Sequence, residues 1–196
     1  MQPIEKSALL VIDVQDSFKV PERWERRSNL QFETNVTALI DGYRRANLPV
    51  IFLLHSDGDP GWRTTDPGYK LMDFLTRLPD EPLLHKTSRN SFTTTDLQRR
   101  LTQLGVRRLT ITGIQTEQCC ETTARVAADL GYDVDFVTEA TLTFPIPLRP
   151  FDWSGEALPA LDVIERTNYV LRHRFARIAT VQDVLGELAA RNACPA

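Results

Sequence analysis

Cysteine is scarce in this chain: its 196 residues include three, Cys119, Cys120 and Cys194. A disulfide framework needs more cysteines than this, and residues 1–7 lack the pattern of a secretion signal. We therefore expect a cytoplasmic protein with free thiols. Cys194, close to the C-terminus, is interpreted as an incidental tail thiol.

Long apolar runs and blocks of basic residues are missing as well. The apolar stretch 8–14 is too short for a membrane span, which takes about 20 residues. The formal net charge is −3, and the most basic stretch, RWERR at 23–27, is interrupted by Glu25. We therefore expect neither a membrane nor a nucleic acid as a partner.

What the sequence does contain is an alternation of short apolar runs with helical patterns. The apolar runs are 8–14, 49–56, 82–86, 108–114, 133–140 and 174–180, and the helical patterns are 35–48, 95–105, 118–131 and 181–192. Gly105 and Gly131 stand where helices would end. Apolar strands separated by helices predict one α/β domain, residues 1–196, with a mostly parallel sheet between two helical layers.

Two segments do not fit this alternation. Residues 57–80 are rich in Gly, Pro and Asp, and residues 141–157 contain three prolines and several aromatic side chains. Long connections in a compact domain are often functional. Both would follow strands, at the sheet edge where open α/β sheets bind ligands.

Three reactive groups follow three of the predicted strands. Asp13 follows LLVI, Lys86 follows PLLH, and Cys119 follows LTITG through a short turn. The carboxyl ends of parallel strands share one edge, so these residues can converge. A buried carboxylate needs a partner such as a lysine, and a helix N-terminus favours a thiolate. Singly, Asp13 could cap a turn, Lys86 could be a surface charge, and a buried cysteine could be a small apolar residue.

Three segments together resemble the isochorismatase-like cysteine hydrolases, a family that includes nicotinamidases and N-carbamoylsarcosine amidohydrolases. The segments read LLVIDVQDSF, HKTSRNSF and TGIQTEQCCETTARVAADLGYDVDFVTEAT. The resemblance implies a Rossmann-like sheet of about six strands and selects Cys119 as the nucleophile. Cys120 stands where the family commonly has valine, so we interpret it as a packing residue.

The resemblance also implies a mechanism without a cofactor. Asp13 would take the thiol proton, Lys86 would keep Asp13 ionised, and Cys119 would attack a small amide or ureido substrate to form a thioester. A non-proline cis peptide is implied between Ile114 and Gln115. The backbone N–H groups of Gln115 and Cys119 would then form an oxyanion hole.

Nicotinamidases commonly bind a metal through one Asp and two His after the second strand, and this chain has little to offer there. The segment HSDGDPGWR contains one histidine, His55, and the other two are His85 and His173. We therefore predict no metal. True isochorismatases lack the nucleophilic cysteine, so Cys119 favours an amidase. The candidate substrate-binding residues are Phe18, Trp24, His55, Trp62, Phe144 and Trp153.

Two other functions stay open at this point. Cys119 and Cys120 could form a redox pair, although neighbouring helical residues are poorly placed for a disulfide. The chain could also be an inactive family member that acts as a binding module. The family often assembles as dimers or tetramers, so we expect a homo-oligomer, with residues 141–157 either at the subunit contact or folded over their own subunit as a lid.

Overall fold

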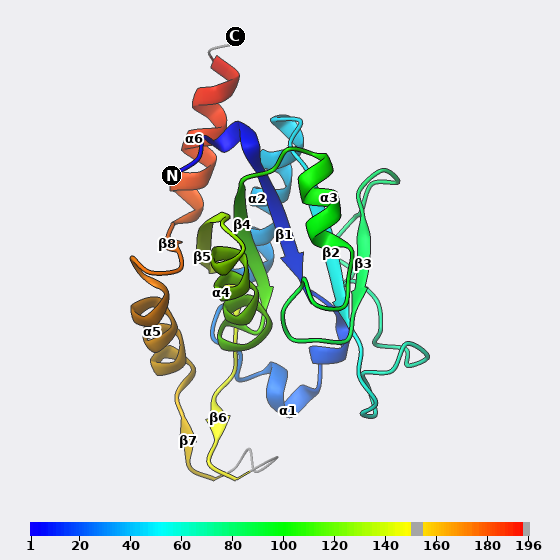
Figure 1. Ribbon diagram of the computed structural model, residues 1–196. Coiled ribbons are helices and arrows are strands. Elements are labelled where there is room, and N and C mark those ends of the chain that lie inside the picture. The colour runs from blue at the N-terminus through cyan, green and yellow to red at the C-terminus, as the bar shows by residue number, and fades with distance from the viewer. Residues whose placement is uncertain (150–154, 194–196) are drawn as a thin grey trace.

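The computed structural model describes residues 1–149 and 155–193, and its centre is a six-stranded parallel sheet (Figure 1). The strands are β1 (Ser7–Ile12), β2 (Val50–His55), β3 (Leu83–Lys86), β4 (Arg108–Ile114), β5 (Asp133–Leu142) and β8 (Arg177–Ile178). Their order is β3-β2-β1-β4-β5-β8, and every neighbouring pair is parallel. The predicted parallel α/β sheet is confirmed.

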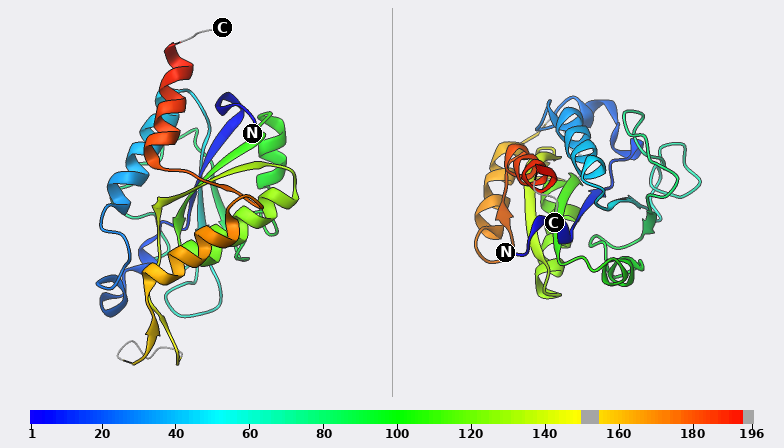
Figure 2. Two further views of the ribbon diagram at one scale, coloured as in Figure 1. Left: turned by 90° about the vertical axis from the view of Figure 1, so that its left-hand side faces the viewer. Right: turned by 90° about the horizontal axis from the view of Figure 1, so that it is seen from above.

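Helices cover both faces of the sheet, as the views in Figure 2 show. One face is covered by α2 (Phe32–Arg45) and α6 (Val181–Ala193), and the other by α3 (Leu97–Gln103), α4 (Glu121–Asp129) and α5 (Ala160–Leu171). The result is the three-layer arrangement that the alternation of apolar runs and helical patterns predicts.

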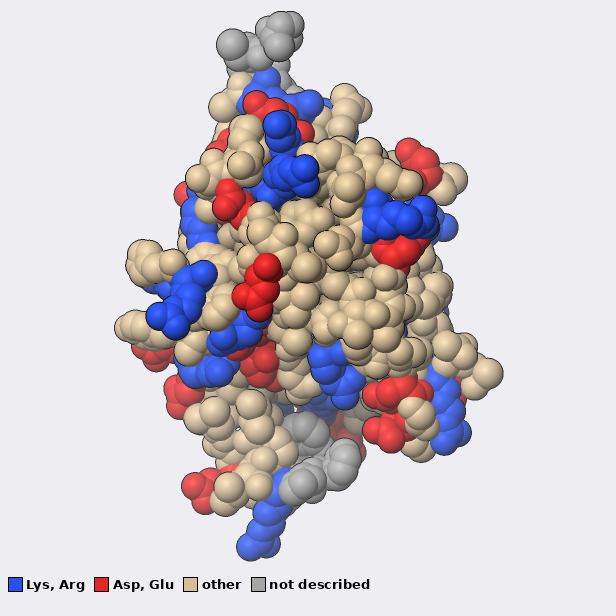
Figure 3. Space-filling view, in the orientation of Figure 1, with Lys and Arg blue, Asp and Glu red and all other residues tan. Residues whose placement is uncertain are grey.

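The outer surface in the view of Figure 3 mixes charges of both signs. Lysine and arginine side chains are interspersed with aspartate and glutamate, and uncharged surface lies between them. Within residues 1–149 and 155–193, no helix is long and apolar enough to cross a membrane.

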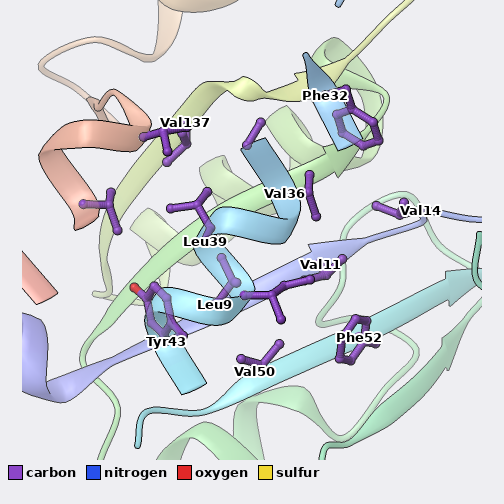
Figure 4. Packing of buried hydrophobic residues seen from close by; sticks show 14 of the residues in the cluster. Leu9, Val11, Val14, Phe32, Val36, Leu39, Tyr43, Val50, Phe52 and Val137 are labelled. Carbon is purple, nitrogen blue, oxygen red and sulfur yellow. The ribbon is translucent and has the colours of Figure 1, made fainter. Parts of the chain in front are cut away.

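Strand β1 shows why the apolar runs do not alternate with polar residues. Leu9 and Val11 pack against α2, whereas Leu10 and Ile12 pack on the opposite face with α3 and α4. Side chains of a strand point alternately to the two faces, and both faces are covered here, so every position from Ala8 to Ile12 is apolar. Figure 4 shows the α2 side of this core, with Val36, Leu39 and Tyr43 lying over the sheet.

The predicted helices are present with shifted limits. Gly105 and Gly131 follow α3 and α4 with φ of +66° and +87°, as helix-ending residues do. The predicted helix 118–131 is divided: a π-type turn, η3 (Thr116–Cys120), precedes α4. Helix α5 was not predicted, because its buried residues, Ala160, Val163, Thr167 and Leu171, are a sparse stripe that includes a threonine.

The carboxyl edge of the sheet, at the bottom of Figure 1, carries the connections that build the site. Two short helices follow β1 at this edge, η2 (Asp16–Phe18) and α1 (Pro21–Trp24). A third, η1 (Ile4–Lys6), precedes β1. Residues 57–80 contain no helix or longer strand, as predicted. In contrast to the expected loop at 141–157, β5 continues to Leu142, and β6 (Ile146–Pro147) pairs antiparallel with β7 (Ala157–Leu158).

Candidate active site

Asp13 is the first residue after β1 and lies in the centre of the sheet's carboxyl edge. Its backbone N–H donates to the Leu53 carbonyl at 2.9 Å, and its φ of +52° is one that aspartate tolerates better than most residues. The side chain is fully buried. This turn directs the carboxylate across the end of the sheet instead of along the strand.

Lys86 ends β3 and reaches Asp13 across the intervening strand β2. Its Nζ lies 2.8 Å from Asp13 Oδ2, with neither side chain exposed, and donates to the Ser88 carbonyl at 3.1 Å. Two buried charges are tolerated because they neutralise each other. The predicted pairing of Asp13 with Lys86 is confirmed.

Cys119 completes the group from the η3 turn that follows β4, on the other side of β1. The residue is 5% exposed, and burial together with the Asp13 charge raises the pKa of its thiol to about 12, although Lys86 opposes the rise. Burial also raises the pKa of Asp13, against the lowering effects of Lys86 and of a hydrogen bond from Cys119. At neutral pH the thiol is therefore protonated while the protein is at rest.

The turn that carries Cys119 is fastened on two sides. Thr116 Oγ1 donates to Thr141 Oγ1 at 2.8 Å. Glu121, two residues after Cys119, is buried and accepts a hydrogen bond from Thr167 on α5 at 3.1 Å. The peptide bond between Ile114 and Gln115 is cis, as predicted. That the N–H groups of Gln115 and Cys119 form an oxyanion hole stays a prediction.

Gly113 allows β4 to approach β1 directly beside the site. Its φ is +130°, and a Cβ built on it would lie 1.9 Å from the Ile12 carbonyl oxygen. No side chain fits there, because both the backbone conformation and the space exclude one. The absence of a side chain at this position therefore permits the close approach of the Asp13 strand and the Cys119 strand.

Five of the six predicted substrate-binding residues form one aromatic group near the carboxyl edge. Ring centroids lie 4.7 Å apart for Phe18 and Trp62, 6.1 Å for Phe18 and Phe144, 6.3 Å for Trp24 and Phe144, and 6.0 Å for His55 and Trp62. Trp153 lies outside the described residues. Three surface hollows lie elsewhere, and none is lined by a predicted site residue.

Several polar residues near the predicted ones were not found from the sequence. The guanidinium of Arg23 lies 4.3 Å from the Phe144 ring centroid, and burial raises the pKa of Glu117, despite Thr143 and Arg23. Gln15 joins β1 to β2 by donating to the His55 carbonyl at 3.0 Å and accepting from the His55 N–H at 2.8 Å. Arg23 lies in the short helix α1, Glu117 in η3 and Gln15 between β1 and η2, and such short elements give no signal of strand ends or helical periodicity.

The place where nicotinamidases commonly hold a metal has a different composition here. His55 Nε2 lies 3.4 Å from Asp57 Oδ2, but it is also contacted by Nη1 of Arg89. A guanidinium at the histidine nitrogen repels a second cation, so these residues do not fit a metal site. Across the described residues, no three His, Cys, Asp or Glu side chains group as metal ligands would.

The parallel sheet and the carboxylate, ammonium and thiol gathered at its carboxyl edge are typical of an α/β hydrolytic enzyme. Residues 7–157 match the family model described as the isochorismatase domain, so the chain belongs to the isochorismatase family of hydrolases. This confirms the resemblance seen in its three segments.

Individual relatives agree with this family. The chain is 26% identical to the isochorismatase family protein YrdC from Bacillus subtilis, covering 93% of this chain and 96% of that protein. It is 34% identical to Nicotinamidase 3 from Arabidopsis thaliana, over 70% of this chain and 74% of that protein. A crystal structure of an isochorismatase-family protein from Chromobacterium violaceum superposes with a TM-score of 0.85 at 26% identity, covering 95% of each chain.

Proposed function

We propose that this protein is a cysteine-dependent hydrolase of small amide or ureido compounds, in which Asp13, Lys86 and Cys119 form the catalytic triad. The observation that carries the proposal is the fully buried Asp13–Lys86 pair, 2.8 Å apart, with the Cys119 thiol as its neighbour. A carboxylate and an ammonium are costly to bury, and a reaction that moves a proton there gives them a use. The similarity to Nicotinamidase 3 supports a carbon–nitrogen substrate.

The proposed reaction moves one proton back and forth through Asp13. Asp13 takes the proton of Cys119 as the sulfur attacks the carbonyl carbon, and the N–H groups of Gln115 and Cys119 hold the oxyanion. Asp13 then gives the proton to the departing nitrogen, ammonia or an amine leaves, and a thioester remains. Water loses a proton to Asp13 and attacks the thioester, which releases the acid and restores the thiol.

The raised pKa of the Cys119 thiol means that this transfer accompanies the attack instead of preceding it. A thiol whose pKa is about 12 is almost wholly protonated at neutral pH. Lys86 lowers the pKa of the thiol, so it favours the thiolate as the sulfur attacks. This part of the proposal needs neither a metal nor a cofactor. A cytoplasmic location also belongs to the proposal, on the small number of cysteines.

The deciding experiment compares two cysteine variants on a panel of small amides, ureido compounds and nicotinamide, with ammonia release as the readout. Cys119→Ala should abolish turnover, whereas Cys120→Ala should keep most of it, because Cys120 is fully buried and is interpreted as a packing residue. Equal losses in both variants would favour a redox pair. No turnover of any compound, together with no labelling of Cys119 by a substrate-like electrophile, would favour an inactive binding module.

A further inference from the structure

Arg89 lies in the loop that follows β3, and its backbone is held firmly on both sides. Asn90 Oδ1 accepts the backbone N–H groups of Phe92 and Thr93 at 2.9 Å each. Ser91 donates its backbone N–H to Thr123 Oγ1 at 3.1 Å, which ties the loop to α4 one turn beyond Cys119. The Arg89 side chain is nevertheless 52% exposed. A fixed backbone therefore presents an accessible guanidinium beside the site.

His55 holds that guanidinium, and simple hydrogen-bond chemistry shows how. Both ring nitrogens face cations: Nδ1 lies 3.4 Å from Lys86 Nζ, and Nε2 contacts Arg89 Nη1. A neutral imidazole has one acceptor nitrogen, so it can accept from only one of them. Lys86 already has Asp13 and the Ser88 carbonyl as acceptors. A guanidinium can only donate, and its contact with Nε2 is the closer of the two, so Nε2 accepts from Arg89 and the proton of His55 is on Nδ1.

His55 is itself a rigid support. His55 is 2% exposed, Gln15 binds both of its backbone polar groups, and Trp62 packs edge-on against the ring. Burial and the charges of Lys86 and Arg89 lower the pKa of His55, which keeps the ring neutral and able to accept. The Arg89 guanidinium is thus one imidazole ring away from the Asp13–Lys86 pair.

We propose that Arg89 binds a carboxylate of the substrate, so that the substrates are small amides or ureido compounds that carry an anionic group. A guanidinium has five N–H donors in a planar fork that matches a carboxylate, and the contact with His55 uses one of them. Asp57 forms an ion pair with the guanidinium at 3.8 Å, which is beyond hydrogen-bond distance. This inference rests on the proposed amide hydrolysis and adds the class of substrate.

The first test measures selectivity between two matched amides. Succinamate carries a carboxylate where 4-methylpentanamide carries an uncharged isopropyl group with the same number of heavy atoms. Arg89→Gln should lower the ratio of kcat/KM for succinamate to that for 4-methylpentanamide about ten- to hundredfold, as loss of a charged hydrogen bond does. Arg99→Gln removes an arginine of α3 that is also more than half exposed and should leave the ratio unchanged. An unchanged ratio in Arg89→Gln would overturn the inference.

Binding separates this inference from the proposed function. Succinamate is titrated by calorimetry into the Cys119→Ala protein, with and without Arg89→Gln. Weaker binding of succinamate without Arg89 supports the inference, whether or not the wild-type protein hydrolyses the amide. If the wild-type protein hydrolyses neither amide, that result counts against the proposed hydrolysis and not against this inference. Binding that does not depend on Arg89, or no binding of succinamate at all, would overturn the inference.

The state of the His55 ring gives a readout that does not depend on any substrate. Nitrogen NMR of the protein labelled at histidine should show His55 with the proton on Nδ1 and none on Nε2, with the signal assigned by its loss in His55→Gln. The opposite tautomer, with Nε2 protonated toward Asp57, would mean that His55 does not hold Arg89, and would overturn the geometry on which the inference stands.

Discussion

A buried lysine and a buried carboxylate stabilise a fold only while they are paired. Replacing Lys86 with Met leaves the Asp13 carboxylate without its counter-charge, and we expect a loss of about 3–5 kcal/mol in the free energy of unfolding. The double variant Asp13→Asn with Lys86→Met should lose much less than the sum of the two single losses, because no charge is left buried. Urea unfolding of the four proteins measures this coupling.

A surface pair supplies the control for that cycle. Asp96 and Arg100 lie 2.8 Å apart on the exposed side of α3, and their coupling should be below about 1 kcal/mol. Additive losses for Asp13 and Lys86, similar to those of the surface pair, would mean that the buried pair is not charged in the folded protein.

The pH dependence of activity should differ from that of stability. Burial raises the pKa of Asp13 above its ordinary value of 3.8, so the base is lost on acidification at a higher pH than usual. A raised pKa also means that the folded protein holds this proton more tightly than the unfolded chain does. Asp13 alone therefore favours the folded state at low pH, and that contribution disappears as the pH rises through its raised pKa.

Carboxylates whose pKa is lowered act in the opposite direction. Asp16 and Asp96, from an ordinary value of 3.8, and Glu81, from 4.5, stabilise the fold above those values and lose this effect as the pH falls through their lowered pKa. We therefore expect kcat/KM to fall on acidification before the protein unfolds. Parallel pH profiles of kcat/KM and of circular dichroism check this, and activity that persists until unfolding would remove Asp13 as the base.

At the scale of single residues, the sequence predicted those site residues that stand at or just after the ends of strands. Asp13, Lys86 and Cys119 follow apolar strands, so parallel topology alone brings them to one edge. Arg89 and Glu117 gave no such signal, because Arg89 lies in the loop after β3 and Glu117 in the irregular turn η3. Cys119 could be told from Cys120 only through the family resemblance, since both lie in the apolar cluster under α4.

At the scale of elements, the paired strands β1 and β4 come especially close at Gly113, beside the site. Gly113→Ala would place a methyl group 1.9 Å from the Ile12 carbonyl in a backbone conformation that side chains rarely adopt. We expect a loss of at least about 2 kcal/mol in the free energy of unfolding. Gly58→Ala is the control, because nothing lies within 4 Å of its added Cβ. Equal stability of the two variants in urea would show that the strands separate easily.

Element limits were predicted least well where the structure departs from regular geometry. The helix expected from 118 begins as the π-type turn Thr116–Cys120, and periodicity cannot distinguish such a turn from an α-helix. The ribbon of β6 and β7 is two residues per strand and contains Pro147, so it carries no strand pattern. Both departures lie at the carboxyl edge, where the site is built.

For the whole molecule, continuous apolar strands and intervening helices were sufficient to predict the parallel sheet, because both faces of every central strand are buried. The assembly state has no such signal. The structure does present exposed apolar side chains on β6, β7 and the first turn of α5, and the residue following β6 adds another. They are Ile146, Leu148, Leu158 and Leu161, with exposed fractions of 41%, 72%, 49% and 69%.

We propose that these side chains meet a second copy of the chain, because exposed apolar groups gathered on neighbouring elements often mark an interface. One chain has a mass of 22.3 kDa. Light scattering at micromolar concentration should then give at least twice that mass. Leu148→Glu combined with Leu161→Glu should reduce this to a single chain without lowering the melting temperature, because both side chains are exposed. Leu130→Glu, at an exposed leucine after α4, is the matched control and should leave the mass unchanged. A mass of one chain for the wild-type protein would leave the ribbon as a lid over its own subunit.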